Sequence, residues 1–166
     1  MTKPLFDSTL SFESPIGTIN LYARENKLVY VEMCQQPVEE TGKSSTLKET
    51  KRQLSKYFSG HKTQIDVPVT YDGTAFQVAV WNYLAKLQFG EVTTYGEIAK
   101  AIGSPAAVRA VGGAVGANPM PLVIGCHRVL GSHKKITGYS GGKGIETKVQ
   151  LLQLEQIDFR DQSLNH

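Results

Sequence analysis

The segment that most constrains the fold carries start and stop signals for two short helices in close succession. Thr94 and Glu97 have the spacing of a capping box, in which each side chain bonds the backbone at the other position. Gly103 is the residue type that commonly ends a helix, and Ser104 followed by Pro105 is typical of the first positions of the next one. The pattern predicts a helix-turn-helix, a motif whose second helix often docks on DNA.

The second predicted helix has an unusually bare surface. Its small residues are Ala110, Gly112, Gly113, Ala114 and Gly116. Glycine inside a helix costs about 1 kcal/mol relative to alanine, so two adjacent glycines indicate close approach to another backbone. Two alternatives remain: tight packing against another helix of the same chain, or docking on an external partner such as DNA.

An apolar run ahead of a cysteine is the second informative feature. Leu122-Val123-Ile124 predicts a short buried strand, after which come Cys126, His127 and Arg128. Nearby basic or cationic groups lower the pKa of a thiol and make it a better nucleophile. The run therefore predicts a nucleophile, a base and a fixed positive charge at a strand end. The alternative is an inert core cysteine beside a solvated His-Arg pair, because free cysteine is among the most buried residue types.

Residues 1–70 carry strand, turn and helix signals but no motif that indicates chemistry. Alternating apolar residues, bounded by turn-forming residues, predict strands, one helix and a further extended stretch. These elements are expected at residues 10–12, 17–21, 28–33, 47–58 and 63–71. A capping box at Thr74 and Gln77 then predicts a helix to about residue 87. We therefore expect an N-terminal α/β scaffold domain over residues 1–70 and a mainly α domain over residues 71–166.

Composition limits the setting in which the chain works. The 166 residues are 40% hydrophobic, enough for a sizeable core. No apolar run approaches the roughly 20 residues that span a bilayer, so no membrane partner is expected. The two cysteines, Cys34 and Cys126, form no disulfide framework and no Cys-x-x-Cys metal pair. A free nucleophilic thiol favours a reducing compartment, and we expect the cytoplasm.

Charge is distributed unevenly along the chain. The net charge is +3, and residues 1–75 are balanced, so the excess lies in the second half. Residues 98–145 contain no Asp or Glu but do contain Lys100, Arg109, Arg128, Lys134, Lys135 and Lys143. An acid-free stretch that covers the second helix and the cysteine run favours a polyanionic partner.

Ordered motifs between about Gly73 and Glu155 carry a resemblance to a known family. The matching segments are residues 73–77, 80–81, 90–91, 94–99, 109–114, 118–119, 126–129, 138–142 and Lys148-x-x-Leu-Leu-x-x-Glu155. With these in order across half of the chain, the sequence resembles the O6-alkylguanine-DNA alkyltransferase family. The resemblance implies an α/β N-terminal domain with an RNase-H-like sheet. It also implies a mainly α C-terminal domain with a winged-helix-like helix-turn-helix.

The resemblance implies a suicide DNA-repair reaction. Cys126 would take an alkyl group from O6 of guanine, or from O4 of thymine, in double-stranded DNA and keep it as a thioether. Each molecule would then repair one lesion. Because O6 lies inside the stacked duplex, the family flips the base out. No cofactor or metal is implied, and the protein is expected to act as a monomer.

The resemblance also assigns catalytic roles around Cys126. His127 would act as the base through a bridging water, with Glu155 orienting it. Tyr95 would contact the flipped nucleotide and help protonate the leaving guanine. Asn118 would connect the second helix to the active segment through bonds to nearby backbone. Without the family, Tyr95 is equally well explained by helix packing, Asn118 by an ordinary helix exit, and Glu155 by the solvated face of a surface helix.

Contacts to DNA and to the flipped base complete the implied set. Arg109 would enter the base stack, and the small residues of its helix suit the narrow minor groove. The expected DNA-binding residues are Arg109, Ala110, Gly112, Gly113 and Tyr95. The expected pocket residues are Val129, Tyr139, Ser140 and Trp81. The loop of Tyr139 and Ser140 is otherwise explained by a plain surface turn. Arg128 is expected to be structural and to pair with internal acids.

Three features depart from the family pattern. Gly125 stands where members usually have proline, so the backbone before the nucleophile is less restricted. Proline there should stabilise the fold by about 0.4–1 kcal/mol if the local geometry is compatible. Residues 142–148 form a slightly longer segment than usual. The zinc ligands of some members have no counterpart in the first half, which has only Cys34 and His61.

Two other function classes remain open. A non-catalytic lesion-binding protein of the alkyltransferase-like type commonly has tryptophan in place of the cysteine, so Cys126 argues against it. A Cys-His hydrolase unrelated to DNA would explain neither Arg109 nor the glycine-rich helix.

Overall fold

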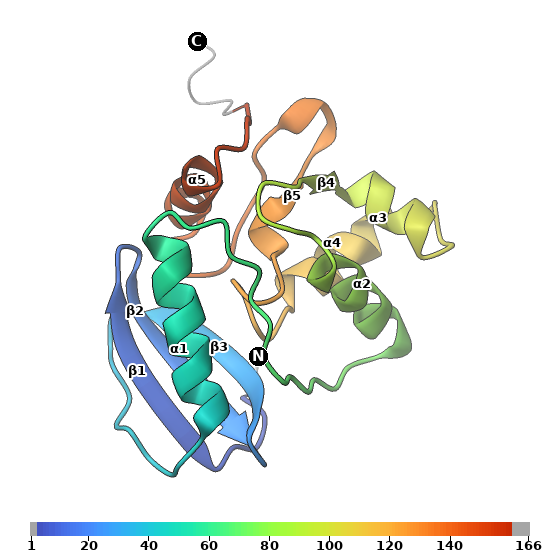
Figure 1. Ribbon diagram of the computed structural model, residues 1–166. Helices are drawn as coiled ribbons and strands as arrows, with labels where there is room; N and C mark the ends of the chain where they lie inside the picture. The colour runs from blue at the N-terminus through green and yellow to red at the C-terminus, as the bar shows by residue number, and fades with distance from the viewer. Residues whose placement is uncertain (1–2, 161–166) are drawn as a thin grey trace.

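The computed structural model describes residues 3–160, and its N-terminal part is a small antiparallel sheet (Figure 1). The strands are β1 (Ser8–Ser14), β2 (Gly17–Arg24) and β3 (Lys27–Cys34), in the order β1-β2-β3. All three were predicted. Glu25 and Asn26 between β2 and β3 have positive φ, as two-residue hairpin turns of type I′ require. The predicted extended stretch over residues 63–71 forms no strand, only one isolated parallel bridge between Val69 and Leu28.

Helix α1 (Ser45–Phe58) covers one face of this sheet. The register pairs Leu10 with Leu21 and Leu21 with Val31, so alternate apolar side chains gather on that face. Leu47 and Leu54 of α1 are buried in the same core. The predicted helix is confirmed, and it completes an N-terminal sheet domain.

The C-terminal part is mainly helical and contains only short strands. Its elements are α2 (Ala75–Ala85), β4 (Thr93–Thr94), α3 (Tyr95–Ala101), α4 (Val108–Gly116), the 3-10 helix η1 (Cys126–Arg128), β5 (Val129–Leu130), the 3-10 helix η2 (Ser132–Lys134) and α5 (Ile145–Leu154). The capping box of Thr74 and Gln77 is formed, and α2 ends two residues before the predicted limit. In Figure 1 the sheet and α1 lie on one side, and α2, α3 and α4 lie on the other.

The two domains share one apolar core. Buried residues of β2 and α1 belong to the same cluster as Val80 of α2, Ile98 of α3 and Val111 of α4. A backbone hydrogen bond also joins the two domains: the Val31 amide donates to the Pro119 carbonyl at 3.0 Å. The position of the C-terminal elements is therefore tied to the sheet.

The helix-turn-helix forms, but its second helix begins later than predicted. The Thr94 hydroxyl caps α3, and Gly103, at φ +79°, ends it. The Ser104 amide donates back to the Ala99 carbonyl at 2.8 Å, so Ser104 finishes the first helix and does not start the second. Helix α4 starts at Val108, without a side-chain cap.

The apolar run before the cysteine is a turn and not the predicted strand. Leu122 has φ +78°, and the Ile124 amide donates to the Met120 carbonyl at 2.8 Å. Leu122 and Ile124 are buried as expected. Burial was thus predicted correctly, but a run of three apolar residues does not by itself distinguish a strand from a buried turn. Among the described residues, no helix is long and apolar enough to cross a membrane.

Candidate active site

Cys126 begins η1 and lines a cavity between the helix-turn-helix and the loop before α5. The cavity has a volume of about 340 Å³. Its lining residues are Tyr95, Gly112, Val115, Gly116, Cys126, Gly138, Tyr139 and Ser140. Cys126 is 7% exposed, so a reactant must enter this cavity to meet the sulfur. Tyr95, Tyr139 and Ser140, which the sequence assigned to the site, are brought together around it.

The thiol is held in its neutral form in the resting protein. Burial raises the pKa of Cys126, and the polar side chains of Asn118 and Tyr139 with the charge of Lys148 oppose that rise only in part. The sequence suggested that His127 and the adjacent Arg128 would lower this pKa. The structure corrects that expectation, because both side chains bond to Glu155. The cysteine therefore needs a base at the moment of reaction.

Glu155, directly after α5, is the centre of a buried polar network. Its carboxylate accepts hydrogen bonds from His127 Nε2, from Arg128 Nε at 2.8 Å, from the Tyr57 hydroxyl at 2.6 Å and from the Gly90 amide at 2.9 Å. Glu155 is 3% exposed, so the expectation of a solvated surface residue is wrong and the role implied by the resemblance fits. The predicted pairing of Arg128 with an internal acid is confirmed.

The charges of this network make His127 a base. Burial alone would raise the pKa of Glu155, but hydrogen bonds from His127 and Arg128 lower it to about 2. An ionised carboxylate only accepts, so His127 Nε2 carries the proton. Burial also lowers the pKa of His127, although Glu155 opposes this, and the ring is neutral. Its Nδ1 is buried without a hydrogen-bond partner among the described residues. Within residues 3–160, the residue that follows Cys126 in the chain therefore has one basic nitrogen without a partner.

Asn118 joins the end of α4 to the active segment. Its Nδ2 donates to the Ile124 carbonyl at 2.8 Å, and its Oδ1 accepts from the Met120 amide at 2.9 Å. These bonds hold the turn before Cys126, and the Asn118 side chain also opposes the rise in the pKa of the Cys126 thiol. An Asn that only ended the helix would not need both polar atoms of its side chain bound to the next turn, as those of Asn118 are.

Most of the small residues of α4 point to solvent, whereas Ala114 is buried at 3% exposure. Arg109, Ala110, Gly113 and Gly116 are exposed, and a side-chain carbon added at Gly113 or Gly116 would meet no atom within 4 Å. A carbon added at Gly112 would only reach ordinary contact with Tyr95, at 4.0 Å. Tight packing against another helix of the chain, the first alternative from the sequence, is therefore wrong for these glycines. The exposed glycines fit the second alternative, docking on an external partner.

Comparisons with known proteins match the whole site region and the sheet domain. The family model described as 6-O-methylguanine DNA methyltransferase, DNA binding domain, matches residues 75–157. The model of the ribonuclease-like domain of the same methyltransferase matches residues 9–71. The chain belongs to the 6-O-methylguanine DNA methyltransferase family.

Relatives of this methyltransferase family match over most of their length. The methylated-DNA–protein-cysteine methyltransferase of Methanosarcina acetivorans is 43% identical over 150 residues, which cover 87% of this chain and 95% of that protein. The constitutive methylated-DNA–protein-cysteine methyltransferase of Bacillus subtilis is 37% identical over 158 residues, which cover 90% of this chain and 95% of that protein. The resemblance drawn from the sequence is confirmed.

Solved structures of the family share the fold. The Mycobacterium tuberculosis O6-methylguanine methyltransferase superposes with a TM-score of 0.78 at 38% identity, covering 95% of this chain and 98% of that one. A crystal structure of Mycobacterium tuberculosis OGT in complex with DNA gives 0.78 at 39% identity, covering 89% and 92%. The arrangement of an N-terminal sheet domain and a C-terminal helical domain is thus common to the family.

Two expected pocket residues of the methyltransferase lie elsewhere. Trp81 is 2% exposed under α4, where its Nε1 donates to the Ala114 carbonyl at 2.8 Å, and it does not line the cavity of Cys126. The expectation that Trp81 lines the pocket is therefore wrong, and Trp81 instead holds the buried side of α4 through this hydrogen bond. Val129 is fully buried, and its carbonyl accepts from Lys148 Nζ at 2.7 Å. The second lone pair of this carbonyl can still accept a hydrogen bond.

Gly125 adopts a backbone geometry that proline could share, but its surroundings are tight. Its φ is −72° and its ψ is 62°, and the Cys126 amide donates across it to the Ile124 carbonyl at 2.7 Å. A carbon added at Gly125 would lie 2.9 Å from Nη1 of Arg128. Arg128 is fixed by Glu155 and by the Leu87 carbonyl, so it cannot move away freely.

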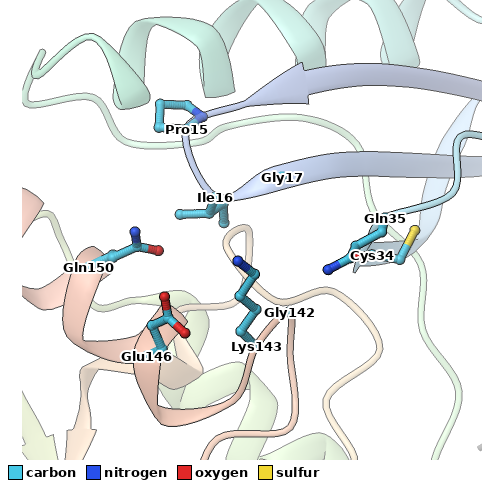
Figure 2. A pocket seen from close by; sticks show the side chains of 9 residues that line it. All are labelled: Pro15, Ile16, Gly17, Cys34, Gln35, Gly142, Lys143, Glu146 and Gln150. Carbon is cyan, nitrogen blue, oxygen red and sulfur yellow. The ribbon is translucent and has the colours of Figure 1, made fainter.

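The second cysteine lies in a different hollow of the methyltransferase. Figure 2 shows this pocket of about 220 Å³, where the β1–β2 turn faces the loop before α5 and its first turns. It contains Cys34 and Gln35 on one side and Lys143, Glu146 and Gln150 on the other. None of its lining residues lines the cavity of Cys126. Because the two cysteines line separate pockets, Cys34 can serve as the control when the reactivity of Cys126 is tested.

Proposed function

We propose that the protein is a suicide DNA-repair methyltransferase in which Cys126 takes an alkyl group from O6 of guanine, or O4 of thymine, in double-stranded DNA. The sulfur attacks the alkyl carbon, the carbon–oxygen bond breaks, and its electrons stay on the base. The product is a thioether, which has no easy leaving group, so each molecule reacts once. The single observation that carries the proposal is a buried Cys126 beside a neutral His127 that Glu155 orients.

The acid–base network supplies what the neutral thiol lacks. We assign His127 Nδ1 as the acceptor of the Cys126 proton, through a bridging water. Glu155 then stabilises the histidinium that forms, while Arg128 keeps the carboxylate ionised. This is the nucleophile, base and orienting group of other thiol enzymes. Tyr95 is assigned the protonation of the departing guanine, because it lines the cavity of Cys126 and carries a hydroxyl that can donate a proton.

Access to the cavity implies base flipping. O6 of a stacked guanine cannot approach the sulfur of a cysteine that is only 7% exposed. The exposed face of α4, with Ala110, Gly112 and Gly113, would lie in the minor groove, where small residues allow close approach. Arg109 projects from the first turn of this helix and would fill the gap in the base stack. The acid-free stretch of residues 98–145 supports a polyanionic partner.

The remaining assignments concern organisation and setting. We place the domain boundary between residues 70 and 71, with an RNase-H-like first domain and a winged-helix-like second one. The first domain acts as a scaffold but also supplies Tyr57 to the network of Glu155. We propose a monomer that works in the cytoplasm, where a reducing environment keeps Cys126 free.

The test is intact-mass measurement after incubation with duplex DNA that carries one O6-methylguanine. The wild type should gain one methyl group per molecule and then stop. Cys126→Ser should gain none, while the matched control Cys34→Ser should react like the wild type. Tight binding to the lesion without a mass change would instead support the non-catalytic lesion-binding class. Neither binding nor a mass change would support a hydrolase unrelated to DNA.

A further inference from the structure

Tyr57 is a buried polar side chain of the N-terminal domain that reaches the site in the C-terminal one. It lies in the last turn of α1 and is 3% exposed. Its ring packs edge to face against Phe58 and Phe89, with centroids 5.3 and 5.8 Å away. Its hydroxyl donates to Glu155 Oε2 at 2.6 Å. The reaction as proposed gives this fixed hydroxyl no part.

The two oxygens of Glu155 have different partners. Oε1 accepts from Arg128 and from the Gly90 amide, whereas Oε2 accepts from both His127 Nε2 and Tyr57. The Tyr57 hydroxyl lies 3.5 Å from Nε2, so the two donors meet at one oxygen. Burial and the charge of Glu155 raise the pKa of Tyr57, and the hydroxyl therefore keeps the proton that it donates. Tyr57 thus competes with His127 for the same negative charge.

This competition affects how strongly His127 holds a second proton. A donor draws charge from the oxygen that accepts it, so Oε2 stabilises a histidinium less when Tyr57 also bonds it. His127 is neutral in the resting protein and has to become a cation when the thiol proton arrives. Without the Tyr57 proton on Oε2, the cation would form more easily in the resting protein. A histidine that is already protonated cannot accept a proton from Cys126.

We propose that Tyr57 is a positioning residue that occupies Oε2 of Glu155 and thereby keeps His127 neutral until the thiol proton arrives. This inference rests on the proposed function. It gives the N-terminal domain a part in the reaction, because α1 supplies the hydroxyl. Burial also disfavours a charged His127. The titratable and charged groups that face His127 or Tyr57 are Glu155, Arg128, Lys148 and Tyr139.

The primary test removes the hydroxyl and follows the pH dependence of the reaction. Single-turnover methyl transfer should fall on the acid side as His127 becomes protonated. In Tyr57→Phe the pKa of His127 rises, so this acid limb should move up by about 0.5–1 pH unit. A full hydrogen bond to a charged group can shift a pKa by roughly one to two units, and Glu155 keeps three other donors. Above the limb the rate should stay near that of the wild type.

Tyr22→Phe is the matched control. Tyr22 is 1% exposed in β2, and its hydroxyl donates to the Glu32 carboxylate at 3.1 Å, far from the cavity of Cys126 along the chain. This variant loses the same kind of bond, yet its pH profile should match that of the wild type. Two results overturn the inference: a Tyr57→Phe profile that is unshifted or uniformly lowered at every pH, or an equal shift in Tyr22→Phe.

A second variant separates hydrogen bonding from disturbed packing. Replacing Tyr57 with 3-fluorotyrosine keeps the ring and makes the hydroxyl a stronger donor, so Oε2 stabilises the histidinium less. The acid limb should then move down, opposite to its movement in Tyr57→Phe. Disturbed packing would move both limbs in the same direction, and that result contradicts the proposal.

NMR of ¹⁵N-labelled histidine distinguishes a failure of this inference from a failure of the proposed function, because it needs no DNA. His127 should become protonated at higher pH in Tyr57→Phe than in the wild type, and equal titration would overturn the inference. If the wild type does not transfer a methyl group to Cys126, the proposed reaction itself is wrong. If it does transfer the group but neither the rate profile nor the titration shifts, the reaction stands and Tyr57 only joins the domains.

Discussion

Substitutions at the exposed glycines of α4 are predicted to raise the stability of the fold but to weaken the binding of DNA. Gly113 is exposed in the middle of the helix, and an added side-chain carbon would meet no atom within 4 Å. Gly113→Ala should therefore raise the free energy of unfolding by about 1 kcal/mol through helix propensity alone. For a chain of this size that corresponds to a rise in Tm of about 2–4 °C, measurable by calorimetry.

The same face should be sensitive to bulk when DNA binds. Gly113→Leu puts several carbons where the duplex would approach, and overpacking of a close interface costs about 1–3 kcal/mol. That range corresponds to about a 5- to 150-fold loss of affinity. The assay is equilibrium binding of Cys126→Ser proteins to duplex DNA with one O6-methylguanine. Reaction of the Cys126 proteins with free O6-benzylguanine should change little, because no duplex has to dock.

Ser55→Leu is the matched control, because it adds a similar side chain at an exposed position of α1. It should leave DNA affinity unchanged. Two results would refute the reasoning. A Gly113→Ala protein that is less stable than the wild type would mean that the glycine face packs inside the protein. A Gly113→Leu protein that binds the lesion as tightly as the control would mean that DNA does not contact this face.

Three further predictions follow from the site. Arg109→Ala should slow duplex repair by roughly tenfold or more, because flipping costs a few kcal/mol, yet leave reaction with free O6-benzylguanine nearly unchanged; equal losses by intact mass would make Arg109 structural. His127→Ala and Glu155→Gln should each slow single-turnover transfer strongly, and the double variant should lose far less than the sum; full additivity would contradict a shared unit. Gly125→Pro should lower the free energy of unfolding by about 1 kcal/mol, as measured in urea. Overpacking against Arg128 costs about 1–3 kcal/mol, whereas the restricted unfolded chain gains only about 0.4–1 kcal/mol. A more stable variant would show that Arg128 moves aside without cost.

Local signals in the sequence predicted the elements that depend on neighbouring residues. The capping box at Thr74 and the hairpin turn at Glu25 both form, because each depends on a few consecutive residues. The start of α4 was misplaced, because Ser104 is used to finish the preceding helix. The turn at Leu122 was missed, because the side chain of Asn118 folds it, and apolar composition does not report such a bond.

Residues that reach the site across the fold were not found from the sequence. Tyr57 bonds Glu155 although 98 positions separate them, and Lys148 meets Thr137 from another element. No short pattern records such contacts. Lys148 was visible only as part of a family motif, where its spacing to Glu155 gave it no role of its own. The sign of the proline effect at Gly125 also changes once the position of Arg128 is known.

The central claim is that Cys126 itself keeps the alkyl group, once, and releases an intact base. The most direct measurement is peptide mapping by mass spectrometry after reaction with duplex DNA whose O6-methylguanine carries a deuterated methyl group. The account predicts label only in the peptide that contains Cys126, a plateau at one label per molecule, and unmodified guanine left in the DNA. Label on Cys34, continued turnover beyond the plateau, or loss of the base from the DNA would contradict it.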